Sequence, residues 1–452
     1  QLFKRSLTIF EEAFGNDHPK LALSFMRLGL VYSGKGLFAE AVEPTKLSLE
    51  IFEKNYGANH LLVAHSLNNL AWIYSEQGRF AEGEPLFKRS MEIYERNLGA
   101  DHPRVALSLM NLAMAYDQKG QLDKAISLHK RSIAINEKAY GKDHPDVADN
   151  LNNLGISLFR QARYAEAEKL HKRSLAIREK AYGKDHPDVA SSLGNLGIIY
   201  LEQGLYDKAE IMYKRALKIN EKTLVYDHPD IAKSLLNLGL AYNNQGRYEE
   251  AEQLYKSSLE RFEKAFGVNH QMGTLVLNNL GTLYLEQELY DKAELVIERS
   301  LKINEKILGP DHTDVAMNLA NLTKIYLYKG KYAKAKSLIK RARKINEKTL
   351  GPDHPSVAGN IRSLANILDI EGNSKEAESL HKVSLGIYEK AYGDNHPHVG
   401  KAYHNLSYYY FYQKDDVKAL IYSRKFVKIY KNRISQGFGE VKKGLRSEQR
   451  TL

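Results

Sequence analysis

Apolar residues recur along this chain every three or four positions, in stretches separated by short polar or glycine-containing breaks. Residues 141–183 show the pattern, with a break at 161–163 between two stretches. The apolar positions on either side of it are Val147, Leu151, Leu154, Ile156, Leu158, Ala165, Ala167, Leu170, Leu175 and Ile177. This spacing is typical of α-helices, because one helix face recurs about every 3.6 residues. We therefore expect a helix A from Pro145 and a helix B from Tyr164 to Gly183, joined by short turns.

A histidine, usually within Asp-His-Pro, marks each copy of this segment. The ten copies are separated by 42 residues each, without insertion or deletion, at His18, His60, His102, His144, His186, His228, His270, His312, His354 and His396. A catalytic motif would not recur in this way, whereas structural modules that stack in register do. The chain is therefore expected to be an array of helical hairpins.

The turns between the expected helices carry residues that end and start helices. Gly141 is expected to end the preceding helix in a left-handed conformation. Either Asp143 or His144 is then expected to cap the next helix, with Pro145 in its first turn, where a missing N–H costs nothing.

Two positions of the repeat hold small residues. One, in helix A, is Gly29, Ala71, Ala113, Gly155, Gly197, Gly239 and Gly281; the other, in helix B, is alanine or glycine in every copy, from Ala41 and Gly83 to Ala419. We expect a neighbouring backbone to lie too close there for a larger side chain. Three residues after the helix A position most copies have a tyrosine, such as Tyr200, which we expect to fill the remaining gap in the packing.

These motifs resemble a known family. The pattern L-x-x-L-G/A-x-x-Y followed by G-x-Y/F-x-x-A resembles the tetratricopeptide repeat, and G-x-D-H-P-D-V-A with L-N-N-L-G resembles the 42-residue repeats of kinesin light chains and related bacterial arrays. The resemblance implies an all-α, right-handed α-solenoid of helical hairpins. We expect the solenoid to span residues 1–431, as a leading helix B and ten repeats, and residues 432–452 to form a polar, basic tail.

Several positions depart from the pattern. Pro44 and Pro85 fall inside the first two complete B helices, which should therefore be bent or start late. Val225 replaces the linker glycine, and Phe438 replaces the eleventh histidine. Residues 1–14 align with helix B without a preceding helix A, so either a longer protein was cut or a further domain precedes the array.

Composition and motifs exclude several classes of function. The chain has 452 residues and no cysteine, so disulfides, thiolate zinc sites and a cysteine nucleophile are excluded. The periodic histidines lie on separate hairpins, too far apart to share a metal ion. None of the common hydrolase, P-loop, zincin or dinucleotide-binding motifs occurs. We expect a non-enzymatic, cytoplasmic protein without cofactor, metal, small-molecule substrate or membrane span.

An asparagine recurs before the second leucine of helix A, and we call this row the asparagine ladder. Its members are Asn69, Asn111, Asn153, Asn195, Asn237, Asn279 and Asn321. Helix propensity does not explain asparagine here. Its amide can both donate to and accept from a peptide backbone, and the resemblance implies that this face of helix A lines a groove that binds an extended peptide. The alternative is that the asparagines bond the neighbouring repeat and set the curvature of the array.

Residues around the ladder vary from copy to copy. The positions three residues after it are Trp72, Met114, Ile156, Ile198, Leu240, Thr282 and Lys324, and those one residue before it include Asn68, Gly194, Leu236, Asn278 and Arg362. A constant backbone reader with variable neighbours is what a peptide-binding surface needs. The apolar run from Trp72 to Leu240 predicts a hydrophobic anchor in the bound segment, and Lys324 and Arg362 predict tolerance for acidic residues.

We therefore expect a protein–protein interaction scaffold that binds an extended or short helical segment of a partner. Two alternatives remain: a sensor module of a larger signalling protein, or a structural, self-assembling array. The net charge of +11 is concentrated in residues 414–452, which carry eleven Lys and Arg against four Asp and Glu. A solubilising end is favoured over contact with nucleic acid or acidic lipid. The sequence does not indicate the oligomeric state.

Overall fold

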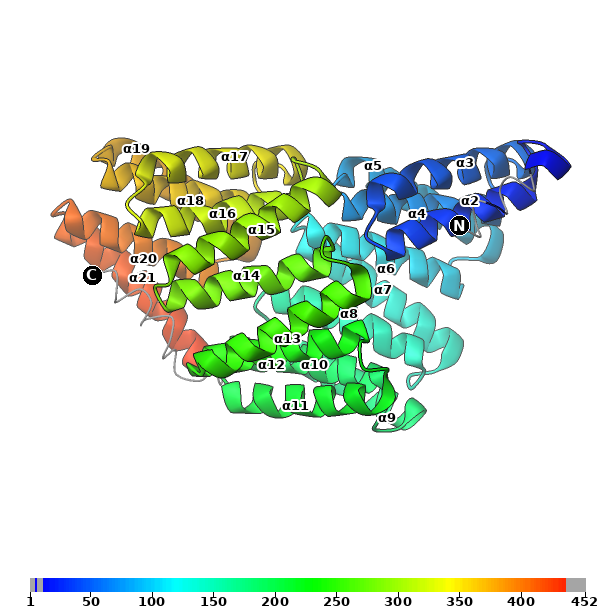
Figure 1. Cartoon of the computed structure of the whole chain (residues 1–452), viewed down its shortest axis with the longest axis horizontal. Helices are drawn as coiled ribbons and strands as arrows, with labels where there is room; N and C mark the ends of the chain where they lie inside the picture. Colours follow the sequence, from blue (N-terminus) through cyan, green and yellow to red (C-terminus); the bar gives the residue numbers. More distant parts are fainter. Residues whose placement is uncertain (1–4, 6–10, 436–452) are drawn as a thin grey trace. The chain divides into compact units, whose positions relative to one another are not determined.

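The computed structural model describes residue 5 and residues 11–435, and it divides into two compact units. The first unit comprises residues 1–157 and 306–312, and the second comprises residues 158–305 and 313–452. Throughout the described residues the regular elements are α-helices, without a β-strand. Within each unit, consecutive helices form hairpins that stack on the next hairpin (Figure 1). The all-α solenoid of helical repeats is therefore confirmed, and the right-handed course of the superhelix stays a prediction.

The hairpins follow the expected division into helix A and helix B. The A helices are α2 (Pro19–Gly34), α4 (Leu61–Glu76), α6 (Pro103–Gln118), α8 (Pro145–Arg160), α10 (Pro187–Glu202), α12 (Pro229–Gln245), α14 (Gln271–Glu286), α16 (Thr313–Tyr328), α18 (Pro355–Ile370) and α20 (Pro397–Tyr412). The B helices are α3 (Phe38–Tyr56), α5 (Phe80–Leu98), α7 (Leu122–Tyr140), α9 (Tyr164–Tyr182), α11 (Tyr206–Thr223), α13 (Tyr248–Phe266), α15 (Tyr290–Leu308), α17 (Tyr332–Leu350), α19 (Ser374–Tyr392) and α21 (Asp416–Ser435). Most of the expected leading helix B and of the tail lies outside the described residues, and α21 continues through residues 432–435.

The periodic histidine caps helix A. In nine hairpins its Nδ1 accepts a hydrogen bond from the backbone N–H two residues later, at 3.0 to 3.2 Å. In six hairpins its ring also stacks on the aromatic residue that ends the preceding helix B, as His144 does on Tyr140 with ring centres 4.5 Å apart. The aspartate before the histidine has another partner, since Asp101 pairs with Lys138 of the following helix B at 2.5 Å. Of the two expected caps, the histidine is therefore the one that forms.

The linker glycine differs from the expectation. Gly141 has φ 88° and ψ 161°, a positive φ with an extended ψ, and so it is not in the left-handed helical region. Only glycine adopts this region readily, because a Cβ would clash there. Where Val225 replaces the glycine, helix α11 ends at Thr223 and Leu224 has an ordinary extended backbone with φ −114°.

The small residues of helix A make room for side chains of helix B. A Cβ added to Gly197 would lie 2.3 Å from the ring of Tyr213, and one added to Gly239 would lie 2.7 Å from the ring of Tyr255. The expected close backbone is therefore wrong for these glycines. In helix B the expectation holds at Gly83, where a Cβ would lie 2.9 Å from the carbonyl oxygen of Ala71.

The two prolines are accommodated within their helices. Pro44 lies inside α3 and Pro85 inside α5, and both helices start at the repeat position at which α9 starts. The expectation of a late start is therefore wrong. A local bend at each proline stays a prediction, because each ring removes one backbone hydrogen bond.

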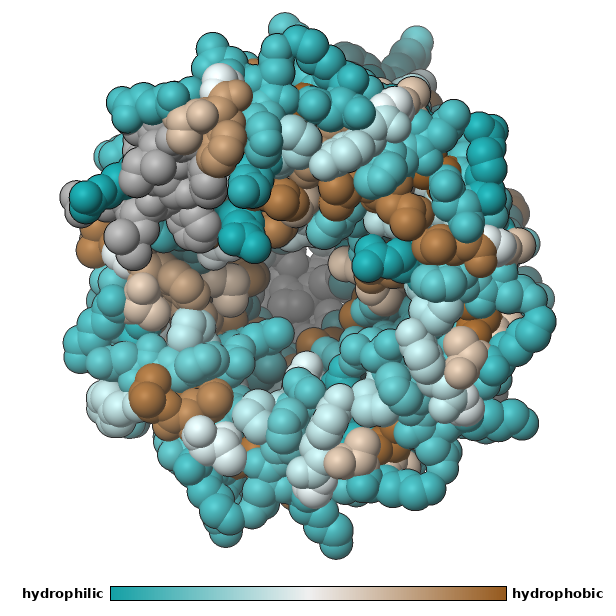
Figure 2. Space-filling view, turned by 90° about the vertical axis from the view of Figure 1, so that its right-hand side faces the viewer, coloured by the Kyte–Doolittle hydropathy of each residue, from teal (hydrophilic) through white to brown (hydrophobic). Residues whose placement is uncertain are grey.

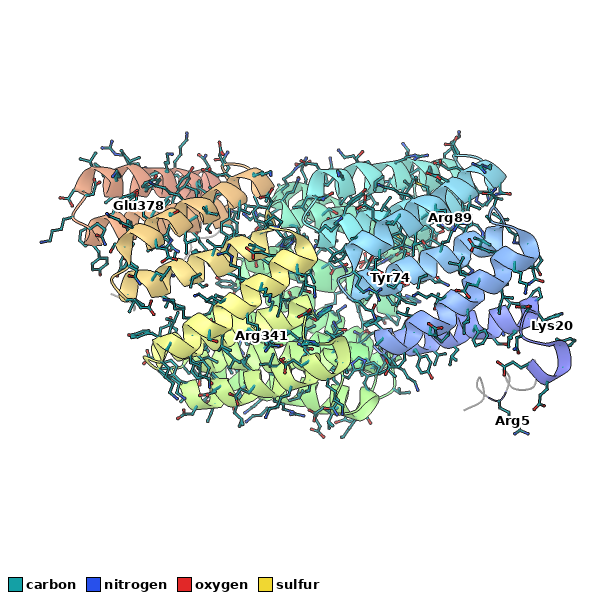
Figure 3. All side chains as sticks on the ribbon, turned by 90° about the horizontal axis from the view of Figure 1, so that it is seen from above. Arg5, Lys20, Tyr74, Arg89, Arg341 and Glu378 are labelled. Carbon is teal, nitrogen blue, oxygen red and sulfur yellow. The ribbon has the colours of Figure 1, made fainter. Side chains whose placement is uncertain are left out.

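A glutamate of helix B ties each of several hairpins to the next one. It accepts a hydrogen bond from the tyrosine hydroxyl of the following helix A, as Glu378 does from Tyr410 at 2.6 Å (Glu378 is labelled in Figure 3). The other pairs are Glu84–Tyr116, Glu168–Tyr200, Glu252–Tyr284 and Glu294–Tyr326. Burial alone would raise the pKa of Glu84, but hydrogen bonds from Lys88, Lys119 and Tyr116 outweigh burial and lower this pKa to about 2. These carboxylates are therefore ionised at neutral pH, and the tyrosine row is part of the packing.

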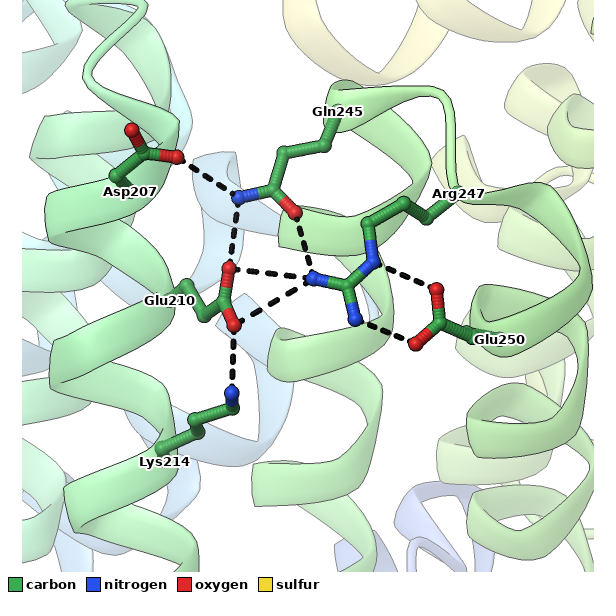
Figure 4. Close-up of polar contacts among 6 residues, drawn as sticks. All are labelled: Asp207, Glu210, Lys214, Gln245, Arg247 and Glu250. Carbon is green, nitrogen blue, oxygen red and sulfur yellow. Dashed lines mark hydrogen bonds and ion pairs between the residues drawn. The ribbon is translucent and has the colours of Figure 1, made fainter.

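The junction between α11 and the hairpin of α12 and α13 shows a larger network of this kind (Figure 4). Glu210 pairs with Lys214 at 2.6 Å and accepts a hydrogen bond from Gln245 at 2.8 Å. Arg247 donates to Glu250 at 2.6 Å, and its guanidinium lies 3.7 Å from the ring centre of Tyr242. Glu210 thus joins the two hairpins, because it contacts both Gln245 and, at 3.4 Å, Arg247 of the next one.

Candidate functional site

One face of each helix A carries the candidate site. It consists of the ladder asparagine and the positions four residues before and three residues after it, which share a helix face because of the 3.6-residue turn. In α6 these are Leu107, Asn111 and Met114, of which Leu107 is 49% and Met114 37% exposed. We call this set of positions the accessible face of helix A.

The row four residues before the ladder escaped the sequence analysis. It includes exposed apolar residues, Leu107, Leu275 and Met317, and exposed lysines, Lys233 and Lys401. The signal was present, because these positions precede each asparagine by one helical turn. An exposed leucine or methionine repeated at one position of an array marks a surface available for contact.

Most of the residues named in the row one residue before the ladder, by contrast, belong to the packing between hairpins, whereas Arg362 is half-buried. Asn68, Gly194, Leu236 and Asn278 are buried, although the sequence analysis placed them on the groove. A step of one residue rotates a side chain by roughly 100° around the helix axis, which turns this row toward the next hairpin. Variation from copy to copy was therefore a misleading signal here.

The ladder asparagines are all partly buried, and they divide by their partners. In the first unit Asn111 donates to the amide oxygen of Asn68 at 3.1 Å, and in the second Asn321 donates to that of Asn278 at 3.4 Å. Asn279 donates to the carbonyl oxygen of Leu275 in its own helix at 2.9 Å. These three asparagines support the structural interpretation, in which the amide bonds its own array.

Other ladder members have amides that remain available. The Nδ2 atom of Asn69 has no hydrogen-bond partner among the described residues, but it is buried out of reach of a bound segment. The side chains of Asn153 in the first unit and Asn237 in the second make no hydrogen bond to any described residue. A half-buried amide without a partner loses hydrogen-bonding free energy, which a bound backbone could restore. Asn153 and Asn237, rather than the whole ladder, are the candidates for reading a peptide.

The row three residues after the ladder is accessible to different degrees. In the first unit Met114 is exposed and Ile156 half-buried, whereas Trp72 packs edge-on against Phe38 with ring centres 5.9 Å apart. In the second unit Ile198 is 36% exposed, while Leu240 packs partly buried against the core. Thr282 and Lys324 are exposed. Met114 and Ile198 are thus the apolar members that a partner can reach most fully.

Lys324 lies in a distinctive electrostatic environment. Its pKa is lowered, first by desolvation and then by the positive charges of Arg362 and Lys401 on the next two A helices. Its side chain is nevertheless exposed to solvent. An exposed lysine that is desolvated is surrounded by protein on several sides, and three neighbouring cations favour the approach of an anionic group.

A buried cluster in the first unit contains the residue types of a hydrolase triad without its arrangement. Ser157 donates to Asp117 at 2.7 Å, and His129 Nε2 lies 3.4 Å from the same carboxylate oxygen. In a catalytic triad the serine bonds the histidine, which takes up its proton. Here both bond the aspartate, and the side chain of His129 is fully buried. The cluster therefore packs α7 against α6 and α8 and has no access to a substrate.

Three further properties bear on the possible chemistry. The described residues contain no group of three or more His, Asp or Glu side chains placed to hold a metal ion. None of the helices searched, which are those of the described residues, is both long and apolar enough to cross a membrane. The face of the molecule in Figure 2 is mostly hydrophilic, with small apolar patches between the polar side chains. Surfaces of this mixed kind suit contacts with other proteins.

Comparisons with known proteins agree with this repeat structure. The family model described as tetratricopeptide repeat matches in overlapping segments that together cover residues 46–222 and 230–432. Among solved structures, a putative kinesin light chain of Podosopora anserina with nearly identical TPR-like repeats is 27% identical, covering 46% of this chain and 98% of that one, with a TM-score of 0.39.

The comparison with solved structures also matched two further proteins. BtubC (BKLC) from P. vanneervenii is 22% identical over 51% of this chain and 90% of that one, with a TM-score of 0.41. The apo form of RapI is 15% identical over 83% of this chain and 99% of that one, with a TM-score of 0.46. No curated protein sequence matches the chain. Because the family model matches most of its length, the chain belongs to the tetratricopeptide repeat family.

Proposed function

We propose that this protein is an interaction scaffold whose A helices bind an extended or short helical segment of a partner protein. Membership of the tetratricopeptide repeat family supports the general role of protein binding. The observation that carries the proposal is the accessible face of helix A, where apolar side chains such as Met114 and Ile198 flank amides such as those of Asn153 and Asn237. Amides give affinity for a backbone, and the variable flanking residues give specificity.

The charge of the second unit refines this proposal. Lys324, Arg362 and Lys401 stand on successive A helices, and the desolvation of Lys324 supports a recessed position for this cluster. A bound segment would thus place apolar residues near Ile198 and acidic residues near Lys324. No chemical step is part of the function.

The proposal is tested by selecting binders from a random peptide display library on the full chain. The affinity of a selected peptide is then measured for Asn153→Ala and Asn237→Ala, whose amides have no partner among the described residues. We expect each variant to bind about tenfold more weakly, because it loses one neutral hydrogen bond between the asparagine amide and the backbone of the peptide, at a site shielded from water. Circular dichroism should show unchanged helix content.

The matched control is Asn269→Ala, which removes an exposed asparagine from the linker before α14. It should leave peptide affinity unchanged. The proposal fails if the library yields no binder, or if binders survive both ladder substitutions and also an aspartate at Ile198. The alternative of a self-assembling array would instead show concentration-dependent association in sedimentation experiments.

A further inference from the structure

A second ladder, on the B helices, links neighbouring hairpins through charge. A glutamate stands at one repeat position from Glu53 to Glu389, in nine successive B helices. In several hairpins it pairs with an arginine of the next helix B, as Glu53 does with Arg89 at 2.6 Å and Glu305 with Arg341 at 2.7 Å (Figure 3). In α5, α9, α11, α13, α15 and α19 the helix offers the next hairpin a second carboxylate, the glutamate at the repeat position of Glu378.

Helix α21 has neither carboxylate. The residue at the repeat position of Glu389 is Lys431, and the residue at the position of Glu378 is Leu420. The final helix B therefore presents a cation and an apolar side chain where six of its counterparts present two acids and α3, α7 and α17 present one. A further hairpin of the same type, with its tyrosine and arginine, would find no acceptor on α21.

The surface of α21 that corresponds to the junction with a next hairpin includes Leu420 and Val427. Val417 and Ile421 extend this apolar surface onto positions that stay exposed on α19, where they are Lys375 and Ser379. Val417, Leu420, Ile421 and Val427 are 71%, 52%, 48% and 41% exposed. On α19 the equivalent of Val427 is Leu385, which is buried because α20 covers that helix. Ring contacts, such as Tyr388 with His398 at 5.4 Å, also hold α20 on α19. The same kind of face on α21 therefore has the shape of a surface that receives a helix.

Three cations accompany these apolar residues along α21. Arg424, Lys428 and Lys431 are exposed, and none of them has an ion-pair partner within the described part of the chain. Spacings of three and four residues place them along one stripe of the helix. We infer that this face of α21, from Val417 to Lys431, binds an acidic amphipathic helix of a partner protein, which covers it as a next helix A would.

Other occupants fit less well. Residues 436–452 carry four Lys or Arg against two Glu, so their charge repels a basic face. A second copy that met this face with its own α21 would bring Arg424, Lys428 and Lys431 against the same three cations. Like charges disfavour such pairing. An acidic helix satisfies both the apolar and the charged parts of the face.

The test uses the full chain and a synthetic helical peptide of about five turns, with leucines spaced i, i+3, i+4 and i+7 and glutamates beside them. Fluorescence anisotropy should show binding of this probe and at least about tenfold weaker binding of the same peptide with lysine in place of glutamate. Leu420→Glu with Lys431→Glu, which introduces the two carboxylates that α19 has at these positions, should weaken binding of the acidic probe by about tenfold or more.

Matched variants locate the effect. Lys428→Glu should weaken binding, whereas Lys344→Glu, at the same repeat position of α17, should not. Asn237→Ala should also leave this binding unchanged, which separates the α21 face from the accessible face of helix A. The inference is overturned if the acidic probe fails to bind, if the lysine probe binds equally well, or if binding survives the Leu420 and Lys431 substitutions. Self-association of the parent chain in sedimentation, or binding to phosphatidylserine vesicles in place of the probe, would also overturn it.

Discussion

Two layers of the helix packing occupy the same repeat position and are built in opposite ways. In the first unit His129 of α7 fills this position and meets the carboxylate of Asp117. In the second unit Tyr213 of α11 fills it and lies directly over Gly197. The polar layer depends on hydrogen bonds and the aromatic layer on volume. A repeat thus keeps its backbone while each layer is matched internally, so the cost of a substitution depends on the layer in which it falls.

The largest effect is expected from placing a larger side chain at Gly197, against the ring of Tyr213. Gly197→Val should lower the free energy of unfolding by about 3 kcal/mol or more, because even its Cβ would lie 2.3 Å from the tyrosine ring. Urea titration measures the loss. Gly386→Ala is the matched control, since this helical glycine has open space around it and alanine there should stabilise α19 by up to about 1 kcal/mol. Equal effects of the two substitutions would contradict the volume argument.

Acid should distinguish the histidines that occupy this position. Burial, helped by the nearby charges of Arg178 and Arg362, lowers the pKa of His171 and His381 to about 4. In the unfolded chain these histidines become protonated near pH 6.5, whereas in the folded chain they become protonated only near pH 4. Stability should therefore fall as pH drops through this window, by up to about 3 kcal/mol for each histidine.

The measurement is a pair of urea titrations at pH 7 and pH 4.5. Replacing His171 and His381 by phenylalanine should flatten the dependence on pH. His129→Phe should instead destabilise the chain already at pH 7, because it leaves the buried carboxylate of Asp117 without that contact. The comparison fails if all three substitutions change the pH dependence in the same way.

Removing the hydroxyl of a tyrosine should change the free energy of unfolding differently at Tyr213 and at Tyr284. The hydroxyl of Tyr213 is buried and has no hydrogen-bond partner in the described part of the chain, so Tyr213→Phe should be neutral or stabilising. The hydroxyl of Tyr284 donates to Glu252 at 2.9 Å, so Tyr284→Phe should lose about 1 kcal/mol. Thermal melting of both variants would reveal the difference, and a loss of stability in Tyr213→Phe would show that its hydroxyl has a partner.

The smallest effect is expected in the turn between helix A and helix B. Ala162 has φ 58°, at a repeat position where Gly204 has φ 73°. Ala162→Gly should stabilise the chain by about 0.5 kcal/mol. Glycine relieves the strain of the positive φ, but part of this gain is lost because glycine is more flexible in the unfolded chain. Gly204→Ala should have the opposite sign. The free energy of unfolding of each variant is measured by urea titration. If it changed in the same direction in both variants, backbone strain would be ruled out as the cause.

The fold was predictable because its signals are local and repeated. The period of 42 residues, the break at 161–163 and the proline at 145 mark helix starts and ends without any knowledge of the packing. The errors arose where two helices meet. The sequence shows that Gly197 is small but not that Tyr213 lies above it, since the two are brought together only by the angle between α10 and α11.

The candidate site was predictable only in part for the same reason. The asparagine ladder and the row after it lie on an accessible face, but the sequence does not distinguish Asn111, which bonds Asn68, from Asn153, which bonds no described residue. That difference depends on whether the preceding hairpin places an amide oxygen within reach. Exposed Leu107 was missed because an apolar residue at helical spacing is usually part of a core.

The repeated pairs between B helices also bear on how such an array changes over generations. Because Glu53 and Arg89, or Glu378 and Tyr410, join residues at fixed repeat positions, the loss or duplication of a whole 42-residue block recreates the same pairs at the new junction. Array length can then change in a single genetic event without new contacts having to evolve. The junction of α17 and α18 is an exception, because Lys336 pairs there with Glu371 at 2.5 Å and Leu368 replaces the tyrosine. A block ending between these residues would place a lysine beside an unmatched hairpin, so this junction is expected to be inherited intact.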